Sequence, residues 1–240
     1  MKYLVLYSTT DGHTKVIAKK LVEEIYRKDN KAKCTLRSIN VFMTENTLTA
    51  EGVEEMEPYD KVVLGANVRY HNFTQEVRQF MKQYAEFLNS IPTAMFIVSL
   101  SACNENKRTP ETNMFVRRFL RACPWKPTKA AVFAGALYYP RYSFFDRCFI
   151  RLIMKLNGGE TDPTVEKVYT DWNSVKTFAG EVVRMKRADV PIALEKAAEE
   201  EKEGAIQERA RRLYRWCVVG VVAGVAAVTG LVSQRRKLLT

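Results

Sequence analysis

The chain has few of the residues that build metal centres or disulfide frameworks. Its 240 residues include two histidines, His13 and His71, and five cysteines. The cysteines are odd in number, widely scattered and without a CxxC pair, so neither a zinc site nor a disulfide scaffold is predicted. We expect reduced thiols in a reducing compartment and no metal. The cysteines are Cys34, Cys103, Cys123, Cys148 and Cys217.

Nucleotide fingerprints and targeting leaders are missing as well. The sequence contains neither GxGxxG nor GxxxxGK[ST], the loops typical of dinucleotide and nucleoside triphosphate sites. A strand-like segment, KYLVLYS, begins at residue 2 and leaves no room for a basic or apolar leader. We therefore expect no secretory signal.

Acidic side chains are absent from the last part of the chain. From Arg209 to Thr240 there are seven basic residues and no acid, which gives this tail +7 of the net charge of +11. Residues 1–208 hold the remaining 31 basic and 27 acidic side chains, a net charge of +4. Nucleic-acid binding ranks last among the functions considered, because most of the excess charge lies outside the folded body.

Between the basic residues of the tail lies an uncharged run of 18 residues, WCVVGVVAGVAAVTGLVS, at 216–233. An apolar run of this length with arginines at both ends is typical of a minimal transmembrane helix. We predict a C-terminal membrane anchor at 216–233 and a basic tail at 234–240; a buried core helix is the alternative. Gly220 and Gly224 form a GxxxG motif, which is weak evidence of dimerisation and leaves a homo-oligomer open.

Short aliphatic runs alternate with amphipathic stretches along the first 190 residues. The strands expected are KYLVLYS, KCTLRSI, KVVLGAN, TAMFIVSL and KAAVFAGAL. The helices expected are Thr14–Arg27, Phe73–Leu88, Thr109–Ala122 and Asp171–Lys186, with a polar stretch after the second strand. This order predicts an α/β fold with a doubly wound five-stranded parallel sheet and helices on both faces.

Two segments depart from the regular alternation. A long insertion, residues 138–167, follows the fifth strand, and insertions of this size usually serve function. Residues 191–215 are charged and alanine-rich without a wide apolar stripe, so we expect a helical spacer that leads to the anchor. The predicted organisation is a domain at 1–190, the spacer, and the anchor.

The first strand ends in a loop of hydroxyl residues with one glycine, STTDGHT at 8–14, before a helix begins. Such a loop places backbone N–H groups and a helix N-terminus around an anion. The alternative is that Ser, Thr and Asp only cap the helix, and the spacing alone leaves the two interpretations even.

Longer strings make a resemblance specific. The phosphate-type loop resembles that of flavodoxin-like proteins, and its Asp-Gly variant resembles the oxygen-independent, quinone-dependent protoporphyrinogen oxidase (dehydrogenase) family. Further segments resemble the same family over about residues 1–186; they are LGANVRY, LNSIP, KRTPETN, AGALYYPRY, RLIMKLNGGETD and VYTDW. The chain departs from the compact bacterial pattern by extra residues near Phe42–Gly52, by the spacer and by the anchor.

The resemblance implies FMN held by three loops at the carboxyl edge of the sheet, with Tyr70 as a stacking ring. It assigns the first loop to the phosphate and the other two to the sides of the isoalloxazine. The implied cofactor-binding residues are Ser8, Thr9, Thr10, Asp11, Gly12, His13, Thr14, Ala66, Asn67, Val68, Arg69, Tyr70, Ser99, Leu100, Ser101, Ala102 and Cys103. We expect His13 on the loop surface, without a catalytic role.

The resemblance also implies oxidation of protoporphyrinogen IX to protoporphyrin IX, with the reduced flavin reoxidised by a membrane quinone, ubiquinone or menaquinone. No protein nucleophile is demanded, since the flavin carries the chemistry. The alternatives are an NAD(P)H:quinone reductase, a membrane-tethered electron-carrier flavodoxin and a flavin-free scaffold. Carriers are usually strongly acidic, which the +4 body is not.

The insertion and its arginines have two open interpretations. Apolar residues at helical spacing and a basic row suit a helix in the lipid headgroup layer, or one whose apolar stripe packs on the core. Substrate propionates could instead be bound by arginines; the candidates are Arg69, Arg141, Arg147 and Arg151. A tail anchor suits a mitochondrial membrane in a eukaryote, which we favour, or the cytoplasmic face of the inner membrane in a bacterium.

Overall fold

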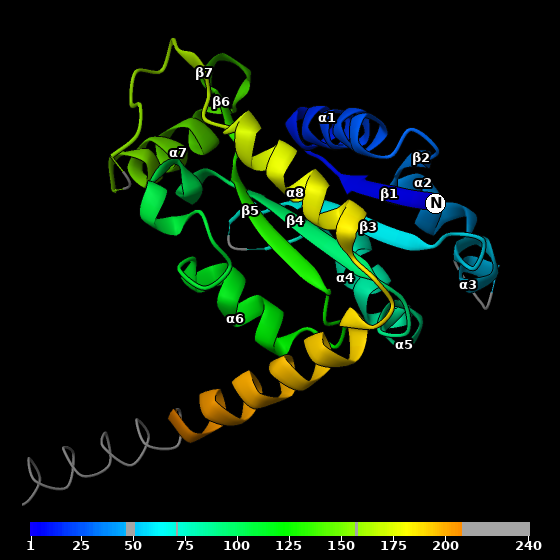
Figure 1. The fold of residues 1–240 in the computed structure, drawn as a ribbon. Coiled ribbons are helices and arrows are strands. Elements are labelled where there is room, and N and C mark those ends of the chain that lie inside the picture. The colour runs from blue at the N-terminus through cyan, green and yellow to red at the C-terminus, as the bar shows by residue number, and fades with distance from the viewer. Residues whose placement is uncertain (47–50, 71, 157, 208–240) are drawn as a thin grey trace, which may run out of the picture. The chain divides into compact units, whose positions relative to one another are not determined.

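A five-stranded parallel sheet forms the centre of the computed structural model, which describes residues 1–46, 51–70, 72–156 and 158–207 (Figure 1). The strand order is β2-β1-β3-β4-β5, so the order reverses beside β1, between β1 and β3. The predicted sheet is confirmed. Its strands are β1 (Lys2–Ser8), β2 (Lys33–Ser38), β3 (Lys61–Asn67), β4 (Thr93–Ser99) and β5 (Lys129–Ala134).

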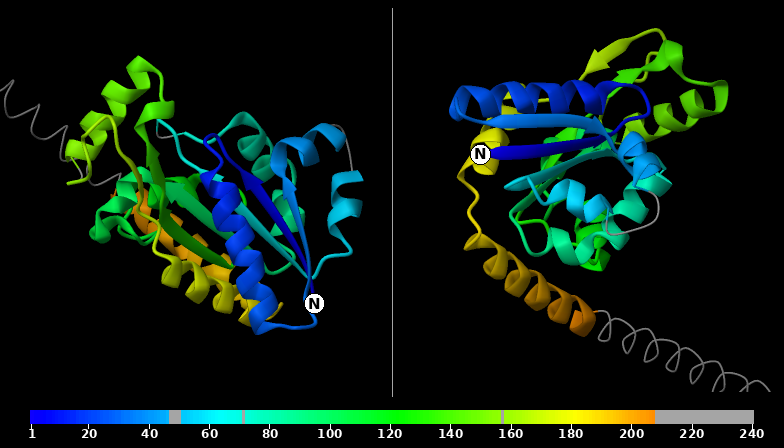
Figure 2. Two further views of the ribbon diagram at one scale, coloured as in Figure 1. Left: turned by 90° about the horizontal axis from the view of Figure 1, so that it is seen from above. Right: turned by 90° about the vertical axis from the view of Figure 1, so that its right-hand side faces the viewer.

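Helices cover both faces of this sheet (Figures 1 and 2). On one face, α1 (His13–Lys28) and α8 (Trp172–Arg184) pack against each other and bury one apolar cluster with the strands. On the other face, a second cluster is buried beneath α2 (Ile39–Glu45), α3 (Glu51–Met56), α4 (Gln75–Gln83), α5 (Ala85–Leu88) and α6 (Met114–Ala122). Strands buried on both sides explain the near-continuous apolar runs of β3 and β4.

Tertiary contacts break two elements that the sequence pattern predicts as continuous. The helix expected over Phe73–Leu88 is divided at Tyr84, which ends α4 and precedes α5. The Tyr84 ring is buried against Phe42 and Phe80, and its hydroxyl donates to the backbone oxygen of Asn46 at 3.2 Å. The expected fifth strand stops at Ala134, and after Gly135 the chain continues as β6 (Ala136–Tyr138) in a separate sheet.

Two further expectations differ locally. The helix expected from Thr109 begins at Met114, because the Asn113 side chain caps it by accepting the Val116 N–H at 3.3 Å. Thr109 and Thr112 form a hydrogen-bonded turn before it. The polar stretch after β2 contains α2 and α3, whose short length gave too little periodicity for detection.

The insertion at 138–167 forms a small unit at the carboxyl end of the sheet (Figure 1). It contains the helix α7 (Phe144–Leu156) and the start of β7 (Glu166–Val168), which pairs antiparallel with β6. The short 3₁₀ turn η3 (Tyr139–Arg141) joins β6 to α7, and two others, η1 (Leu100–Cys103) and η2 (Glu105–Lys107), follow β4. A third apolar cluster holds the unit together: Leu137, Tyr139, Tyr142, Ile150 and Met154.

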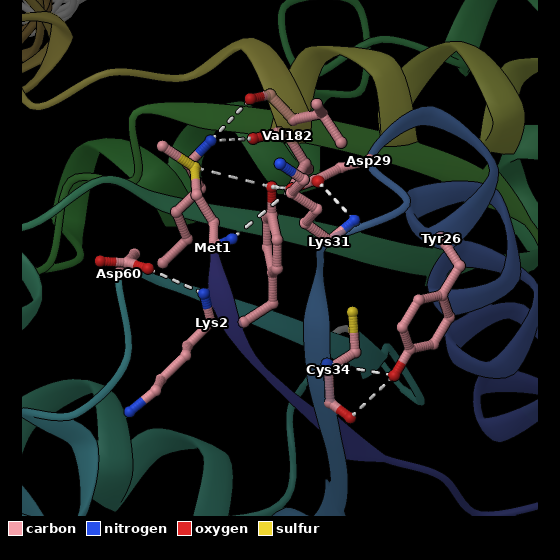
Figure 3. Close-up of polar contacts among 11 residues, drawn as sticks. Met1, Lys2, Tyr26, Asp29, Lys31, Cys34, Asp60 and Val182 are labelled. Atoms are coloured by element: carbon pink, nitrogen blue, oxygen red, sulfur yellow. Dashed lines mark hydrogen bonds and ion pairs between the residues drawn. The ribbon is translucent and has the colours of Figure 1, made fainter.

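Polar contacts fasten the opposite end of the sheet (Figure 3). The Lys2 backbone N–H donates to the Asp60 carboxylate at 2.7 Å, and the Cys34 backbone N–H donates to the Tyr26 hydroxyl at 3.2 Å. These bonds connect the N-terminal ends of the strands to neighbouring segments. Ligands of doubly wound sheets bind at the other edge, beside the carboxyl ends of the strands.

The charged segment after α8 is helical over residues 189–207. Within the described part of the chain, no helix has the length and apolar character needed to cross a bilayer. The predicted anchor at 216–233, the basic tail and the last residues of the predicted spacer lie outside the described residues.

Candidate functional site

A cavity of about 360 Å³ opens at the carboxyl edge of the sheet. Its walls come from the loops after β1, β3 and β4, and from α7 of the insertion. The β1 and β3 loops flank the point where the strand order reverses, which is where doubly wound sheets bind ligands. The position of the cavity therefore follows from the topology.

The loop between β1 and α1 has unused hydrogen-bonding capacity. Thr9 lines the cavity, and its buried hydroxyl oxygen has no hydrogen-bond partner among the described residues. Gly12, the N-cap of α1, has φ of +83° and, as a glycine, has no side chain to cap the helix. The first N–H groups of a helix have no partner within the helix, so this loop presents donors toward an anion.

The β3 loop contributes a second incomplete group. Asn67 donates from Nδ2 to the Thr10 hydroxyl at 2.9 Å, which joins the first two loops. Its Oδ1 atom is buried without a partner in the described part of the chain. Because a buried acceptor is costly when left unsatisfied, Thr9 and Asn67 indicate a polar ligand that reaches both loops.

Arg69 connects the β3 loop to the insertion. Its guanidinium pairs with the Asp146 carboxylate on α7 at 2.8 Å and lies 3.8 Å from that of Asp11. Tyr70, at φ of +52°, also donates its hydroxyl to Asp146, and its ring lies 5.0 Å from that of Phe149. The predicted stacking ring thus lines the cavity and also contacts α7.

The β4 loop supplies the third wall. The Ser99 and Ser101 hydroxyls lie 2.9 Å apart, and Asn113 donates from Nδ2 to Ser101 at 3.2 Å. Leu100 and Lys107 also line the cavity. This wall combines hydroxyl groups with an apolar side chain and a cation.

The remaining wall is apolar and comes from the insertion. Four side chains of α7 line the cavity, together with Tyr142. Burial raises the pKa of the Tyr142 phenol. At neutral pH the phenol is therefore protonated and uncharged. The α7 residues are Phe149, Ile150, Ile153 and Leu156.

His13 lies in the interior, so the expectation of a surface position was wrong. It is 7% exposed, at the start of α1. Thr170 donates its hydroxyl proton to the Ala134 backbone oxygen at 2.7 Å, so His13 Nε2 must donate to Thr170 at 2.7 Å. His13 Nδ1 then accepts from Tyr138 at 3.4 Å. Burial lowers the pKa of His13, which favours this neutral tautomer.

Most of the predicted cofactor residues line the cavity. The structure brings twelve of them together: Thr9, Thr10, Asp11, His13, Thr14, Asn67, Val68, Arg69, Tyr70, Ser99, Leu100 and Ser101. Five others lie in these loops or at the ends of the strands before them, outside the lining: Ser8, Gly12, Ala66, Ala102 and Cys103. Ser8 instead lies 3.3 Å from the Thr74 hydroxyl, and Ala66 and Ala102 are core residues.

Of the four arginines proposed for the substrate, Arg69 lines the cavity and the other three do not. Arg141 pairs with Glu166 at 3.0 Å, Arg147 donates to the Tyr142 backbone oxygen at 3.2 Å, and Arg151 donates to the Thr161 backbone oxygen at 2.9 Å. These contacts hold the insertion together.

Sequence reasoning missed the cavity residues that come from outside the three loops. Phe115, Gly135, Tyr142 and the α7 side chains reach the cavity through tertiary packing. The signal available was the helical spacing of apolar residues in the insertion, which does not reveal which neighbour that helix covers.

Comparisons with known proteins agree with this geometry. The flavodoxin-domain family model matches residues 4–164, a range that contains all of the cavity lining. The protoporphyrinogen IX dehydrogenase [quinone] of Escherichia coli K12 is 43% identical over 185 residues, which are 77% of this chain and 96% of that protein. This chain belongs to the quinone-dependent protoporphyrinogen IX dehydrogenase family.

A second member of the dehydrogenase family matches almost from end to end. The Leishmania major protein of the same name is 37% identical over 235 residues, which are 98% of this chain and 97% of that protein. Among solved structures, oxidised flavodoxin 1 of Bacillus cereus covers 78% of this chain and 99% of its own, with 12% identity and a TM-score of 0.40. That structural likeness is too weak to add to the family assignment.

Proposed function

We propose that this chain oxidises protoporphyrinogen IX to protoporphyrin IX and passes the electrons through FMN to a quinone. The observation that carries the proposal is the 43% identity to a protoporphyrinogen IX dehydrogenase [quinone] that aligns over 96% of its length. The cavity at the sheet edge provides the site for this activity.

The residues of the cavity fit FMN. The uncapped N-terminus of α1 and the unpartnered Thr9 hydroxyl would hold the phosphate. The unpartnered Asn67 Oδ1 is an acceptor that suits a ring N–H. FMN, when bound, supplies two-electron redox chemistry, and removal of six electrons from the porphyrinogen therefore takes three cycles.

The protein's own groups have positioning roles in this reaction. The apolar side chains of α7 exclude water from one side of the cavity, and the neutral His13 and Tyr142 place no charge beside an apolar macrocycle. Arg69 is a cation in the cavity wall that pairs with Asp146, and its remaining N–H groups can bind a substrate propionate. Lys107 also lines the cavity and adds a second cation.

We also propose that residues 216–233 anchor the chain in a bilayer. The uncharged run between arginine clusters supports this. The alignment with the Leishmania major relative covers 98% of this chain and therefore includes most of the tail. Anchoring would keep the cavity near a lipid-soluble quinone and raise its effective concentration.

The membrane is proposed to be mitochondrial in a eukaryote and the inner membrane, on its cytoplasmic side, in a bacterium. The uncharged run between clusters of basic residues supports this choice. A homo-oligomer through the GxxxG at Gly220 and Gly224 is a weaker proposal, because the whole run is rich in small residues.

The test is a comparison of electron donors. Purified full-length protein is assayed for released FMN, and then for porphyrin fluorescence with protoporphyrinogen IX and a ubiquinone analogue. We expect FMN-dependent porphyrin formation that requires the quinone under anaerobic conditions. Quinone reduction by NADPH without turnover of protoporphyrinogen would replace this proposal with an NAD(P)H:quinone reductase. A protein that binds no FMN would contradict both.

A further inference from the structure

The helix α7 has a buried face that fixes it to the domain. Ile150 and Met154 are buried against Tyr139 and Tyr142. Successive residues of an α-helix are turned by about 100°, so Ile150 and Met154 lie on one side of α7. The packing interpretation from the sequence was made for other apolar side chains of this helix and is not confirmed for them: Phe145, Cys148, Phe149, Leu152 and Leu156 are exposed, and Ile153 is half-buried.

A different side of α7 is apolar and exposed. Phe145, Phe149, Leu152 and Leu156 are 83%, 40%, 56% and 75% exposed. Their spacing of three and four residues places them in one stripe along the helix. Large apolar side chains exposed singly are ordinary, whereas a continuous stripe marks an interaction surface. We call these four residues the α7 stripe.

Basic side chains run along the edge of the α7 stripe. Arg151 and Lys155 are exposed and four residues apart, and Arg147 is half-buried one turn before them. On the helix, the apolar stripe therefore lies between this basic row and the side that faces the cavity. A helix with an exposed apolar stripe and a basic edge has the chemistry to bind an anionic lipid surface.

The α7 stripe is continuous with the cavity. Phe149 and Leu156 are exposed, and both also line the cavity. Their side chains therefore form part of the boundary between the cavity and the surroundings of the helix. A surface seated on the stripe would lie directly beside the cavity mouth.

We propose that the α7 stripe inserts into the headgroup layer of an anionic bilayer, so that the cavity opens toward the lipid phase. Lipid-soluble quinone then reaches the cavity along α7 without crossing water. The quinone part of this inference rests on the function proposed above, whereas the lipid contact does not. The apolar stripe supplies the hydrophobic contribution, and Arg151 and Lys155 supply the attraction to anionic headgroups.

Tryptophan placed on α7 tests the contact in the full-length protein. Phe145→Trp is reconstituted in vesicles of brominated phosphatidylcholine and phosphatidylglycerol, and the loss of fluorescence is compared with the parent protein. Met114→Trp is the matched control, since Met114 is 76% exposed on α6. Both variants keep the same C-terminal tail and the same native tryptophans, so the difference reports on α7.

We expect about threefold stronger quenching of the added tryptophan at 145 than at 114, because bromine atoms quench on contact and a headgroup-bound helix lies at the acyl boundary. Lys155→Glu should weaken the quenching at 145 in anionic vesicles and leave that at 114 unchanged. In vesicles of phosphatidylcholine alone, the quenching at 145 should also be weaker.

Equal quenching at 145 and 114 would overturn the proposal. A blue shift in the emission of the added tryptophan at 145 without lipid would also overturn it. A shift that grows with protein concentration would mean that the stripe binds a second copy of the chain. A shift independent of concentration would mean that it binds the chain's own tail. These optical readouts need no turnover. If the tryptophan at 145 is not quenched but the protein has dehydrogenase activity, only the lipid contact is refuted. If that tryptophan is quenched but the protein has no dehydrogenase activity, only the proposed function is refuted.

Discussion

At Gly12 the backbone adopts a conformation that side chains disfavour, directly before the helix that would bind the phosphate. Its φ is +83°, and a Cβ there would meet no atom within 4 Å. A substitution by alanine is therefore penalised through the backbone and not through a clash. For an L residue this penalty is about 1–2 kcal/mol.

We predict that Gly12→Ala weakens FMN binding by about 5- to 30-fold, which is that penalty expressed as a ratio of dissociation constants. The measurement is titration of the apoprotein with FMN, followed by quenching of flavin fluorescence. Gly158→Ala is the control, because Gly158 has φ of +69° with open space around it and lies after α7. Equal effects of the two substitutions would refute a specific role of the first loop.

His13 makes the stability of the protein depend on pH. Burial lowers its pKa in the folded state below the ordinary value of 6.5. Between the folded pKa and 6.5, the unfolded chain therefore binds more protons, and stability falls as the pH falls through this window. Above 6.5 both states are neutral and the contribution is constant.

We expect the wild type to lose more stability between pH 7.5 and about 5.5 than His13→Gln, because glutamine does not titrate. Urea denaturation at the two pH values gives the comparison, since other groups titrate equally in both proteins. Identical pH dependence in the two proteins would show that folding does not change the pKa of His13. The sequence could place His13 in the loop, but its burial depends on Tyr138, Thr170 and Trp172, which arrive from distant segments.

At the scale of elements, one buried lysine connects the sheet to a helix end. Lys61, the first residue of β3, is 1% exposed and donates from Nζ to the backbone oxygens of Val182 and Val183 at 2.9 and 2.7 Å. These carbonyls belong to the last turn of α8, where backbone acceptors lack partners within the helix. A cation is also favourable at a helix C-terminus.

We predict that Lys61→Met destabilises the protein by about 2–4 kcal/mol, since two carbonyls lose charge-assisted hydrogen bonds worth about 1.5–3 kcal/mol each and methionine regains part through packing. Chemical denaturation measures the change. Lys129→Met is the matched control, because Lys129 also begins a strand, β5, but is exposed. A loss below 0.5 kcal/mol for Lys61→Met, about the scatter of surface substitutions, would contradict the capping role.

The elements show where sequence patterns suffice. Short strand-like segments predicted all five strands of the central sheet. The apolar runs were longest in β3 and β4, because these strands are buried on both faces. The break at Tyr84 had no local signal, since it depends on the Tyr84 hydroxyl reaching the Asn46 backbone. At Gly135, the local pattern continues although β6 pairs with β7, a segment that lies about thirty residues later.

At the scale of the whole molecule, the topology of the sheet determines where the cavity lies, and the insertion supplies its remaining wall. The carboxyl ends of β1, β3 and β4 meet at one edge in any sheet of this order, so the three loops could be predicted to converge. The position of α7 over that edge could not, because its apolar spacing fits both packing and lipid contact. In the structure one side of α7 is packed, with Ile150 and Met154 buried, and another side, the α7 stripe, is exposed.

The charge distribution also has meaning only for the whole chain. The body carries +4 and the tail +7, so electrostatic attraction to an anionic surface is concentrated in the tail and in the basic row of α7. The proposed anchor and the α7 stripe would then act on the same bilayer, one as a tether and the other at the cavity mouth.

The most direct test of the central claim separates the two half-reactions. FMN-loaded protein is mixed anaerobically with protoporphyrinogen IX, and flavin absorbance and porphyrin fluorescence are followed before and after addition of a quinone. We predict that the flavin is bleached by the porphyrinogen alone, and that the quinone restores its colour as porphyrin accumulates. A flavin that stays oxidised in the presence of protoporphyrinogen IX, but is bleached by NADPH, would contradict the account.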